Sequence, residues 1–158
     1  MNLQLKEKGF TIIEVVLVLA IAGLIFLMVF IALPALQRNQ RDSQRKNDLS
    51  RAQTALVSYQ SNNRNASPGV TDALWATFKT QYLIAGTDTF EDPSFGSYIF
   101  KFKDTTRTAP STSVADNGEI WVFSSSTCNG ETISSSASVR KVALAMKLEG
   151  GGVSCVNN

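Results

Sequence analysis

The sequence predicts an α+β protein in which a long N-terminal α-helix packs on a small antiparallel β-sheet. Val15 to Leu33 form an unbroken run of 19 residues without a polar side chain, long enough for an α-helix to cross a bilayer. From Ala35 to Asn63 there is neither Gly nor Pro, and apolar residues recur at helical spacing. The remaining residues contain short segments in which apolar and polar side chains alternate, as in half-buried strands.

The composition excludes several kinds of chemistry. The chain of 158 residues has no His and two Cys, so Ser-His-Asp and Cys-His catalytic arrangements and Cys₄ or His-bearing zinc sites are excluded. Asp88, Glu91 and Asp92 could offer carboxylates to calcium, but they lack EF-hand spacing. The sequence therefore predicts no enzyme activity, no cofactor and no metal.

The apolar run is best interpreted as a membrane-spanning helix. A secretory signal peptide is one alternative, but its apolar region normally has about 7 to 15 residues. A buried core helix is another, but a helix that is apolar on every face needs a large protein around it. Basic residues flank the run on both sides: Lys6 and Lys8 before it, and Arg38, Arg41, Arg45, Lys46 and Arg51 after it.

Glu14 lies one position before the uninterrupted run. Carboxylates inside a membrane are costly, and they are usually paired or functional. The alternative is a position at the headgroup level, where the positive end of the helix dipole meets the negative charge. Charge arguments alone do not separate these two interpretations.

The string KGFTIIEVVLVLAIAGLI, residues 8–25, resembles the N-terminus of a type IV prepilin. In that family, a prepilin peptidase cleaves the class III signal after its glycine and methylates the new terminal residue. The resemblance implies cleavage between Gly9 and Phe10 and N-methylation of Phe10. It also implies that Glu14 acts in assembly by pairing with the terminal ammonium of Phe10 in a neighbouring subunit, because an unpaired buried charge is costly.

The resemblance also implies a pilin-like fold and a domain organisation. Residues 1–9 would be the prepilin leader and 10–36 the transmembrane and filament-core helix. Residues 37–63 would be an amphipathic stem helix, and 64–158 a globular α/β head with a C-terminal disulfide loop. Pro34 lies three residues further along the run than the proline usual in many pilins. We expect it to kink the helix, so that the bent segment of the family is displaced or absent here.

The stem has an apolar and a basic face. Leu49, Ala52, Leu56 and Tyr59 recur at spacings of three and four residues and predict the face that packs on the head. Arg38, Arg41 and Arg45 share another face. Our interpretation is a solvated face near lipid headgroups; contact with phosphates, as in a DNA-uptake filament, or charge matching between subunits remain alternatives.

The head is predicted to contain one helix and at least three strands. Thr71 is the expected N-cap of a helix that continues to Tyr82. The alternation predicts strands at Tyr98–Phe102, Ile120–Phe123 and Val142–Leu148. Strands in series suggest an antiparallel sheet that covers the apolar face of the stem. The Ser/Thr-rich chain between the strands is interpreted as solvated loops.

Cys128 and Cys155 both follow the membrane run. An even count suits a disulfide in an oxidising compartment, and two free thiols are the alternative. The pilin resemblance favours pairing, because many pilins close a C-terminal loop in this way. The run Glu91 to Tyr98, EDPSFGSY, is similar to a segment before the sheet of major pseudopilins of type II secretion and of some Gram-positive pilins.

The resemblance implies a structural subunit of a type IV pilus, a filament for twitching motility, adhesion or DNA uptake. Its partners would be copies of itself and other pilins, the prepilin peptidase, membrane lipid before assembly and, indirectly, a platform protein and an assembly ATPase; DNA is a possible partner without support. One alternative is a pseudopilin of a type II secretion or competence system. Another is a single-span anchored ectodomain that binds a ligand and does not polymerise.

The predicted location is a single-pass membrane precursor with its C-terminal domain outside the cytoplasm, and an extracellular pilus after assembly. The charge of the flanks argues against this orientation. The positive-inside rule places the more basic flank in the cytoplasm, and here that flank follows the apolar run. The leader and the cysteines support the outward orientation.

Overall fold

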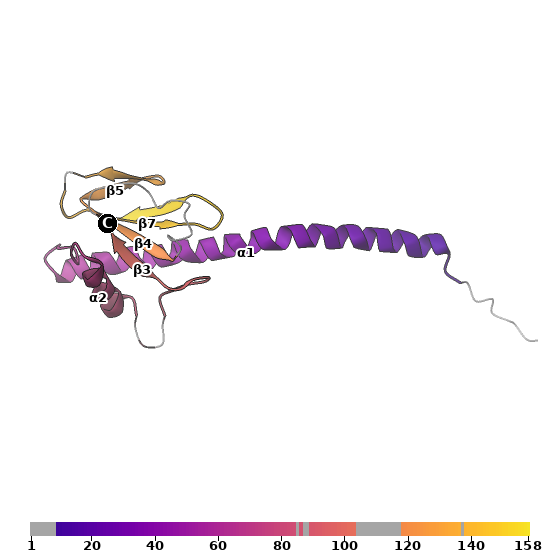
Figure 1. Ribbon diagram of the computed structural model, residues 1–158, viewed down its shortest axis with the longest axis horizontal. Helices are drawn as coiled ribbons and strands as arrows, with labels where there is room; N and C mark the ends of the chain where they lie inside the picture. The colour runs from indigo at the N-terminus through magenta and orange to yellow at the C-terminus, as the bar shows by residue number, and fades with distance from the viewer. Residues whose placement is uncertain (1–8, 85, 87–88, 104–117, 137) are drawn as a thin grey trace, which may run out of the picture. The chain divides into compact units, whose positions relative to one another are not determined.

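The computed structural model describes residues 9–84, 86, 89–103, 118–136 and 138–158 (Figure 1). The chain divides into two compact units, one ending at Gln37 and the other beginning at Arg38. Each unit is described by itself below. The leader residues 1–8, the candidate calcium ligand Asp88 and most of the Ser/Thr-rich stretch before Gly118 lie outside the described residues.

Helix α1 (Ile12–Asn62) contributes to both units. Its bounds agree closely with the helix expected from Phe10 to Asn63. Just after the helix, Arg64 and Asn65 adopt left-handed backbone angles with φ of 54° and 62°. The Asn65 N–H donates to the Gln60 carbonyl at 2.7 Å, so one of the last carbonyls of the helix is satisfied without a glycine at its end.

Helix α2 (Asp72–Tyr82) begins as the sequence predicts. Thr71 has an extended backbone, and its hydroxyl accepts from the Leu74 N–H at 3.5 Å. Trp75 and Phe78 are buried, three residues apart on the face that packs on the core.

Four strands form the main sheet: β3 (Ile99–Phe102), β4 (Glu119–Ser124), β7 (Val142–Lys147) and β8 (Val153–Asn157), in the spatial order β3-β4-β7-β8. The pairs β4–β7 and β7–β8 are antiparallel, as expected. The pair β3–β4 is parallel, with Ile99 opposite Glu119 and Phe102 opposite Val122. The sheet is therefore mixed.

The length of the connection accounts for the parallel pair. Parallel neighbours require a crossover of about a dozen residues or more, whereas antiparallel neighbours can be joined by a tight turn. Residues 103–118 separate β3 from β4, which is long enough to return the chain to the same end of the sheet. Our expectation that strands in series would all pair antiparallel did not take this length into account.

Besides β8, four strands that form two hairpins were not expected. β1 (Glu91–Asp92) and β2 (Gly96–Ser97) pair as one hairpin, and β5 (Ser126–Asn129) and β6 (Thr132–Ser135) as another. The β5–β6 hairpin occupies part of the Ser/Thr-rich stretch that we interpreted as solvated loops. The alternation of apolar and polar residues is hard to recognise in this hairpin, because most of its side chains are Ser and Thr and Ile133 is its one large apolar residue.

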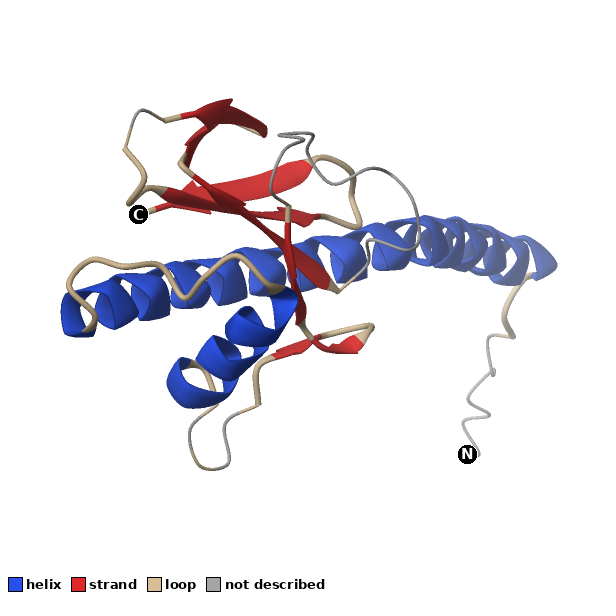
Figure 2. Cartoon of the chain, turned by 60° about the vertical axis from the view of Figure 1, so that its left-hand side comes forward, coloured by secondary structure: helices blue, strands red, loops and turns tan. Residues whose placement is uncertain are grey.

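The core of the second unit lies between the stem part of α1, α2 and one face of the sheet (Figure 2). Leu49, Ala52 and Leu56 are fully buried there, which confirms the apolar face of the stem. The same cluster contains the alternating residues of the strands, Tyr98, Phe100, Ile120, Val122, Val142, Leu144 and Met146. A second, smaller cluster lies on the other sheet face, where Phe123, Ala143 and Ala145 pack with Ile133 of β6.

Candidate functional site

The predicted processing point lies at the exposed start of α1. Gly9 and Phe10 precede the helix, and the Phe10 side chain is 89% exposed. No described atom lies within 4 Å of the position where a Cβ on Gly9 would be placed. Within the described residues, the start of the helix is therefore uncovered on the side of Gly9.

Glu14 is held by the residue that starts the helix. Its Oε2 accepts a hydrogen bond from the backbone N–H of Thr11 at 2.8 Å and another from the Thr11 hydroxyl at 2.8 Å. Thr11 occupies the N-cap position and Glu14 the third helical position, so this is one half of a capping box. Within the single chain the carboxylate of Glu14 thus satisfies a donor of the helix terminus.

The first unit presents apolar side chains on every side. None of its most apolar stretch is buried. Among the described residues, α1 is the one helix long and apolar enough to cross a membrane. No described part of this unit covers these side chains, so by length and composition the helix fits a membrane-anchored precursor.

Pro34 lies inside α1, which is helical on both sides of it. The segment before Pro34 is therefore not melted, although proline removes one backbone hydrogen bond at this point. The kink that we expected at Pro34 remains a prediction.

A buried ion-pair cluster anchors the stem to the head. Arg45 is 2% exposed, and its Nε and Nη2 donate to the two carboxylate oxygens of Asp92 at 2.6 and 2.9 Å. This two-point geometry is the strong form of an Arg–carboxylate pair. The Asp92 Oδ1 also accepts from the N–H groups of Ser94 and Phe95, so the same carboxylate fixes the turn between β1 and β2.

The turn between β7 and β8 joins the same cluster. Glu149 accepts from Arg41 at 2.6 Å and from Arg45 at 3.1 Å. Asp42 accepts from the N–H groups of Glu149 and Gly150, at 2.7 Å each. Three segments that are distant in sequence are thereby joined around one guanidinium.

The cluster changes the acidity of its members. The hydrogen bond from Arg41, supported by Ser94 and by the charge of Arg45, lowers the pKa of Glu149 from 4.5 to about 2. Burial alone would lower the pKa of Arg45, but the hydrogen bond and charge of Asp92 and the charge of Glu149 outweigh it and raise that pKa. Both shifts favour the charged forms.

The prediction that the arginine face is solvated is wrong for Arg45 and holds only in part for Arg41. Arg45 is buried against Asp92, and Arg41 is partly covered and paired with Glu149. Arg38 is the exposed member of the three. The expectation failed because helical spacing identifies a shared face without showing which acidic side chains from the rest of the chain cover it.

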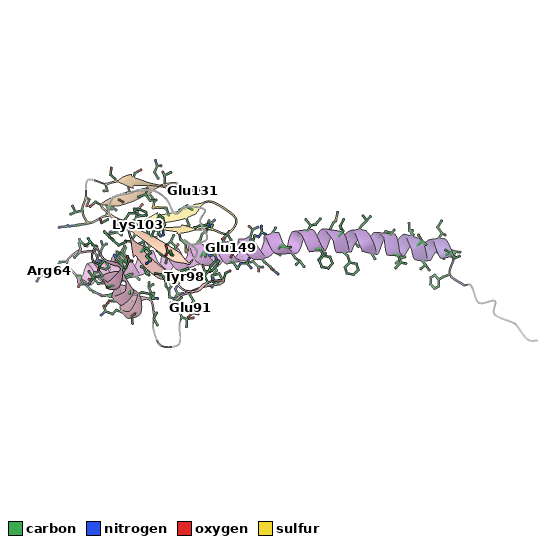
Figure 3. All side chains as sticks on the ribbon, in the orientation of Figure 1. Arg64, Glu91, Tyr98, Lys103, Glu131 and Glu149 are labelled. Carbon is green, nitrogen blue, oxygen red and sulfur yellow. A yellow bond between two sulfur atoms is a disulfide. The ribbon has the colours of Figure 1, made fainter. Side chains whose placement is uncertain are left out.

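The Asp-Pro…Gly…Tyr run of the sequence supplies two of the contacts between head and stem. Asp92 binds Arg45, and the buried Tyr98 hydroxyl donates to Asp48 of α1 at 3.1 Å. Burial raises the pKa of Asp48, and burial together with the charge of Asp48 raises the pKa of Tyr98. Tyr98 and Glu149 are labelled in Figure 3, and both contact α1.

Cys128 and Cys155 form a disulfide, with their Cα atoms 5.7 Å apart. The bond joins β5 to β8. The Asn157 side chain accepts from the Cys128 N–H, and the Asn157 carbonyl accepts from Gln53 of α1 at 2.7 Å. The disulfide hairpin is thus connected through β8 to the stem.

Sequence reasoning did not identify several of these anchoring residues. Asp42 carried a signal that could have been used, because it stands three residues before Arg45 on the same helix face. Glu149 carried none, since a glutamate followed by three glycines is typical of any exposed turn. Thr11 could have been found as a helix N-cap with a glutamate three residues later.

Residues 4–30 match the family model of the prokaryotic N-terminal methylation motif. No curated protein and no solved structure matches the chain. The chain therefore carries a type IV prepilin-like class III signal that leads into a long apolar helix, and its α+β architecture fits a pilin-like fold.

Proposed function

We propose that this chain is the precursor of a type IV pilus subunit that is cleaved between Gly9 and Phe10, methylated on Phe10 and polymerised through its N-terminal helix. The observation that carries the proposal is the coincidence of the methylation motif at residues 4–30 with a helix whose apolar side chains are exposed on every side. Lipid covers this surface in the precursor, and helices of other subunits cover it in the filament.

Glu14 has a defined task in this scheme. After cleavage, Phe10 carries a positive terminal amine that must enter an apolar filament core. A carboxylate on a neighbouring subunit neutralises it, and both charges then avoid an unpaired state in low dielectric. Because the Thr11 N–H and hydroxyl hold the Glu14 carboxylate at 2.8 Å, its position is fixed before the neighbour arrives.

Arg41 and Arg45 of the basic flank pair with Asp42, Asp92 and Glu149 in the folded head. The positive-inside rule counts Lys and Arg during insertion and gives acidic residues little weight, so this pairing does not change the charge argument. The proposed outward orientation of the head is supported by the methylation motif and the disulfide.

Co-expression with a prepilin peptidase tests the processing step. The proposal predicts a product that begins at Phe10 and carries one additional methyl group on its N-terminus, identified by mass spectrometry. A chain that stays uncut in the presence of an active peptidase would favour the anchored ectodomain that does not polymerise. Gly9→Leu is the matched control, because a bulkier residue before the cut should block cleavage while the apolar helix is unchanged.

A pseudopilin of a secretion or competence system is the second candidate. It is favoured by the Asp-Pro…Gly…Tyr run, whose Asp92 and Tyr98 connect the head to the stem. Imaging of intact cells separates the two candidates. Long surface filaments that contain the chain support the pilus, and short filaments confined to the envelope support the pseudopilin.

A further inference from the structure

The outer edge of the main sheet presents backbone groups that no strand pairs. β3 is the edge strand, and β4 is its one neighbour in the sheet. The N–H groups of Ile99 and Lys103 donate to β4 or to its preceding residue, at 3.0 and 2.8 Å. In a parallel pair, alternate residues bond to the same neighbour. The backbone groups of Tyr98, Phe100 and Phe102 therefore point to the open edge.

Helix α2 satisfies the two ends of this edge and leaves its middle open. Lys79 donates to the Tyr98 carbonyl at 2.9 Å, and Asp72 accepts from the Phe102 N–H at 2.7 Å. Among the described residues, the N–H and C=O of Phe100 have no hydrogen-bond partner. One donor and one acceptor of the edge are thus unpaired, although Phe100 as a whole is only 3% exposed.

A groove of about 320 Å³ lies at this point, between α2 and β3. Ala73 and Ala76 line its helix side, and Phe100 lines its strand side. Its volume is at the lower end of the range of small ligand sites, about 300 to 1,000 Å³. The small alanine side chains leave room beside the unpaired backbone of Phe100.

Lys79 gives the groove a positive end. Its ammonium contacts two neutral oxygens, the Ser97 hydroxyl and the Tyr98 carbonyl, each at 2.9 Å. Asp72, at the other end, pairs with Lys101 at 3.3 Å. Within the described part of the chain Lys79 forms no ion pair, so its charge is available to an anionic group.

We propose that this groove binds a short extended peptide from another protein, which adds to β3 as a further strand and places a free C-terminal carboxylate on Lys79. A strand offers an acceptor and a donor together, as the C=O and N–H of Phe100 require. The carboxylate matches the ammonium in charge. The site lies in the second unit and does not depend on polymerisation.

The test uses the full chain, labelled with ¹⁵N, in detergent micelles. The probe is the tripeptide acetyl-Val-Thr-Val with a free carboxylate, and the same peptide with an amidated C-terminus is its control. We expect the free acid to shift the amide signal of Phe100 and to slow its hydrogen exchange. Amidation should weaken binding about tenfold, because a charge-assisted hydrogen bond becomes a neutral one.

Three variants separate binding from folding. Lys79→Gln keeps a donor for the Tyr98 carbonyl but removes the charge, and it should weaken binding of the free acid about tenfold. Ala76→Phe fills the groove without changing charge and should abolish binding. Lys103→Gln is the matched control, since Lys103 lies over the Trp121 ring, 4.3 Å from its centre, and it should bind as the unchanged chain does.

Three results would overturn the proposal. They are equal affinity for the acid and the amide, unchanged binding by Lys79→Gln, and no response of the Phe100 amide at millimolar peptide.

Discussion

Arg45 is the residue through which the stem helix and the head share a charge cluster. Its guanidinium is almost fully buried and contacts carboxylates from α1, from β1 and from the β7–β8 turn. Removing one partner of such a cluster leaves uncompensated charges in a low-dielectric environment, which costs more than the pair itself contributes. The cluster is therefore sensitive to single substitutions.

Arg45→Met should lower the free energy of unfolding of the head by about 3–5 kcal/mol, because Asp92 stays buried without its partner. Urea unfolding of the full chain in micelles, followed by tryptophan fluorescence, measures the change; Trp75 is fully buried and reports on the core. Lys46→Met is the matched control, because Lys46 is the exposed next residue of the same helix. Equal losses in the two variants would contradict the role of the cluster.

Glu149 gives the head a specific acid sensitivity. Its pKa falls from 4.5 to about 2 in the folded protein, so its ionised form favours folding. This stabilisation is complete above pH 4.5 and is lost as the pH falls through about 2. Glu149→Gln should therefore have a shallower decrease in stability between pH 4.5 and 2, measured by urea unfolding across that range. Parallel curves for the two proteins would show that Glu149 has no such role.

At Glu14, two substitutions separate helix capping from charge pairing. Glu14→Ala should still insert into the membrane but fail to form filaments. Glu14→Gln keeps an oxygen that accepts from the Thr11 N–H but carries no charge. If pairing with the Phe10 amine drives assembly, Glu14→Gln fails as well, with membrane insertion checked by fractionation and filaments by shearing and electron microscopy. Normal filaments from Glu14→Gln would limit the residue to capping.

Among the helices and strands, the spacing of apolar residues predicted those whose buried face can be read from their own sequence. The apolar run, the face at Leu49 and Leu56 and the capped helix from Thr71 were all found where expected. The strands around Phe100 and Leu144 were found as well, because their side chains alternate between the core and the opposite face.

The elements that were missed depend on long-range contacts. β8 alternates weakly, and its place in the sheet is fixed by pairing with β7 and by the disulfide. The parallel β3–β4 pair depends on the path of a long connection. The burial of Arg45 depends on Asp92 and Glu149, which lie 47 and 104 positions away along the chain. The sequence around Arg45 does not indicate which distant acidic residues will contact it.

The Cys128–Cys155 disulfide is the covalent element of the head, and it closes a loop with a sequence separation of 27. Replacing both residues by Ser should lower the free energy of unfolding by about 2–5 kcal/mol. The same urea titration in micelles measures it, with the unchanged chain under reducing and oxidising conditions as the control. A chain whose stability is the same with and without reductant would contradict this role.

At the scale of the whole molecule, the near-zero mean hydropathy of the sequence is an average over two different units. The first unit ends at Gln37 and exposes apolar side chains that need lipid or other helices. The second begins at Arg38 and has its own core, ion-pair cluster and disulfide. This division suits the proposed function, in which the first unit passes from lipid into a polymer of like helices while the head keeps its own core.

We propose that this chain is a cleaved and methylated filament subunit. The most direct test is mass analysis of the N-terminus of the protein in filaments sheared from the cell surface. We predict a mature chain that begins with methylated Phe10. Sheared filaments that lack the chain, together with full-length uncut protein in the membrane fraction, would contradict it.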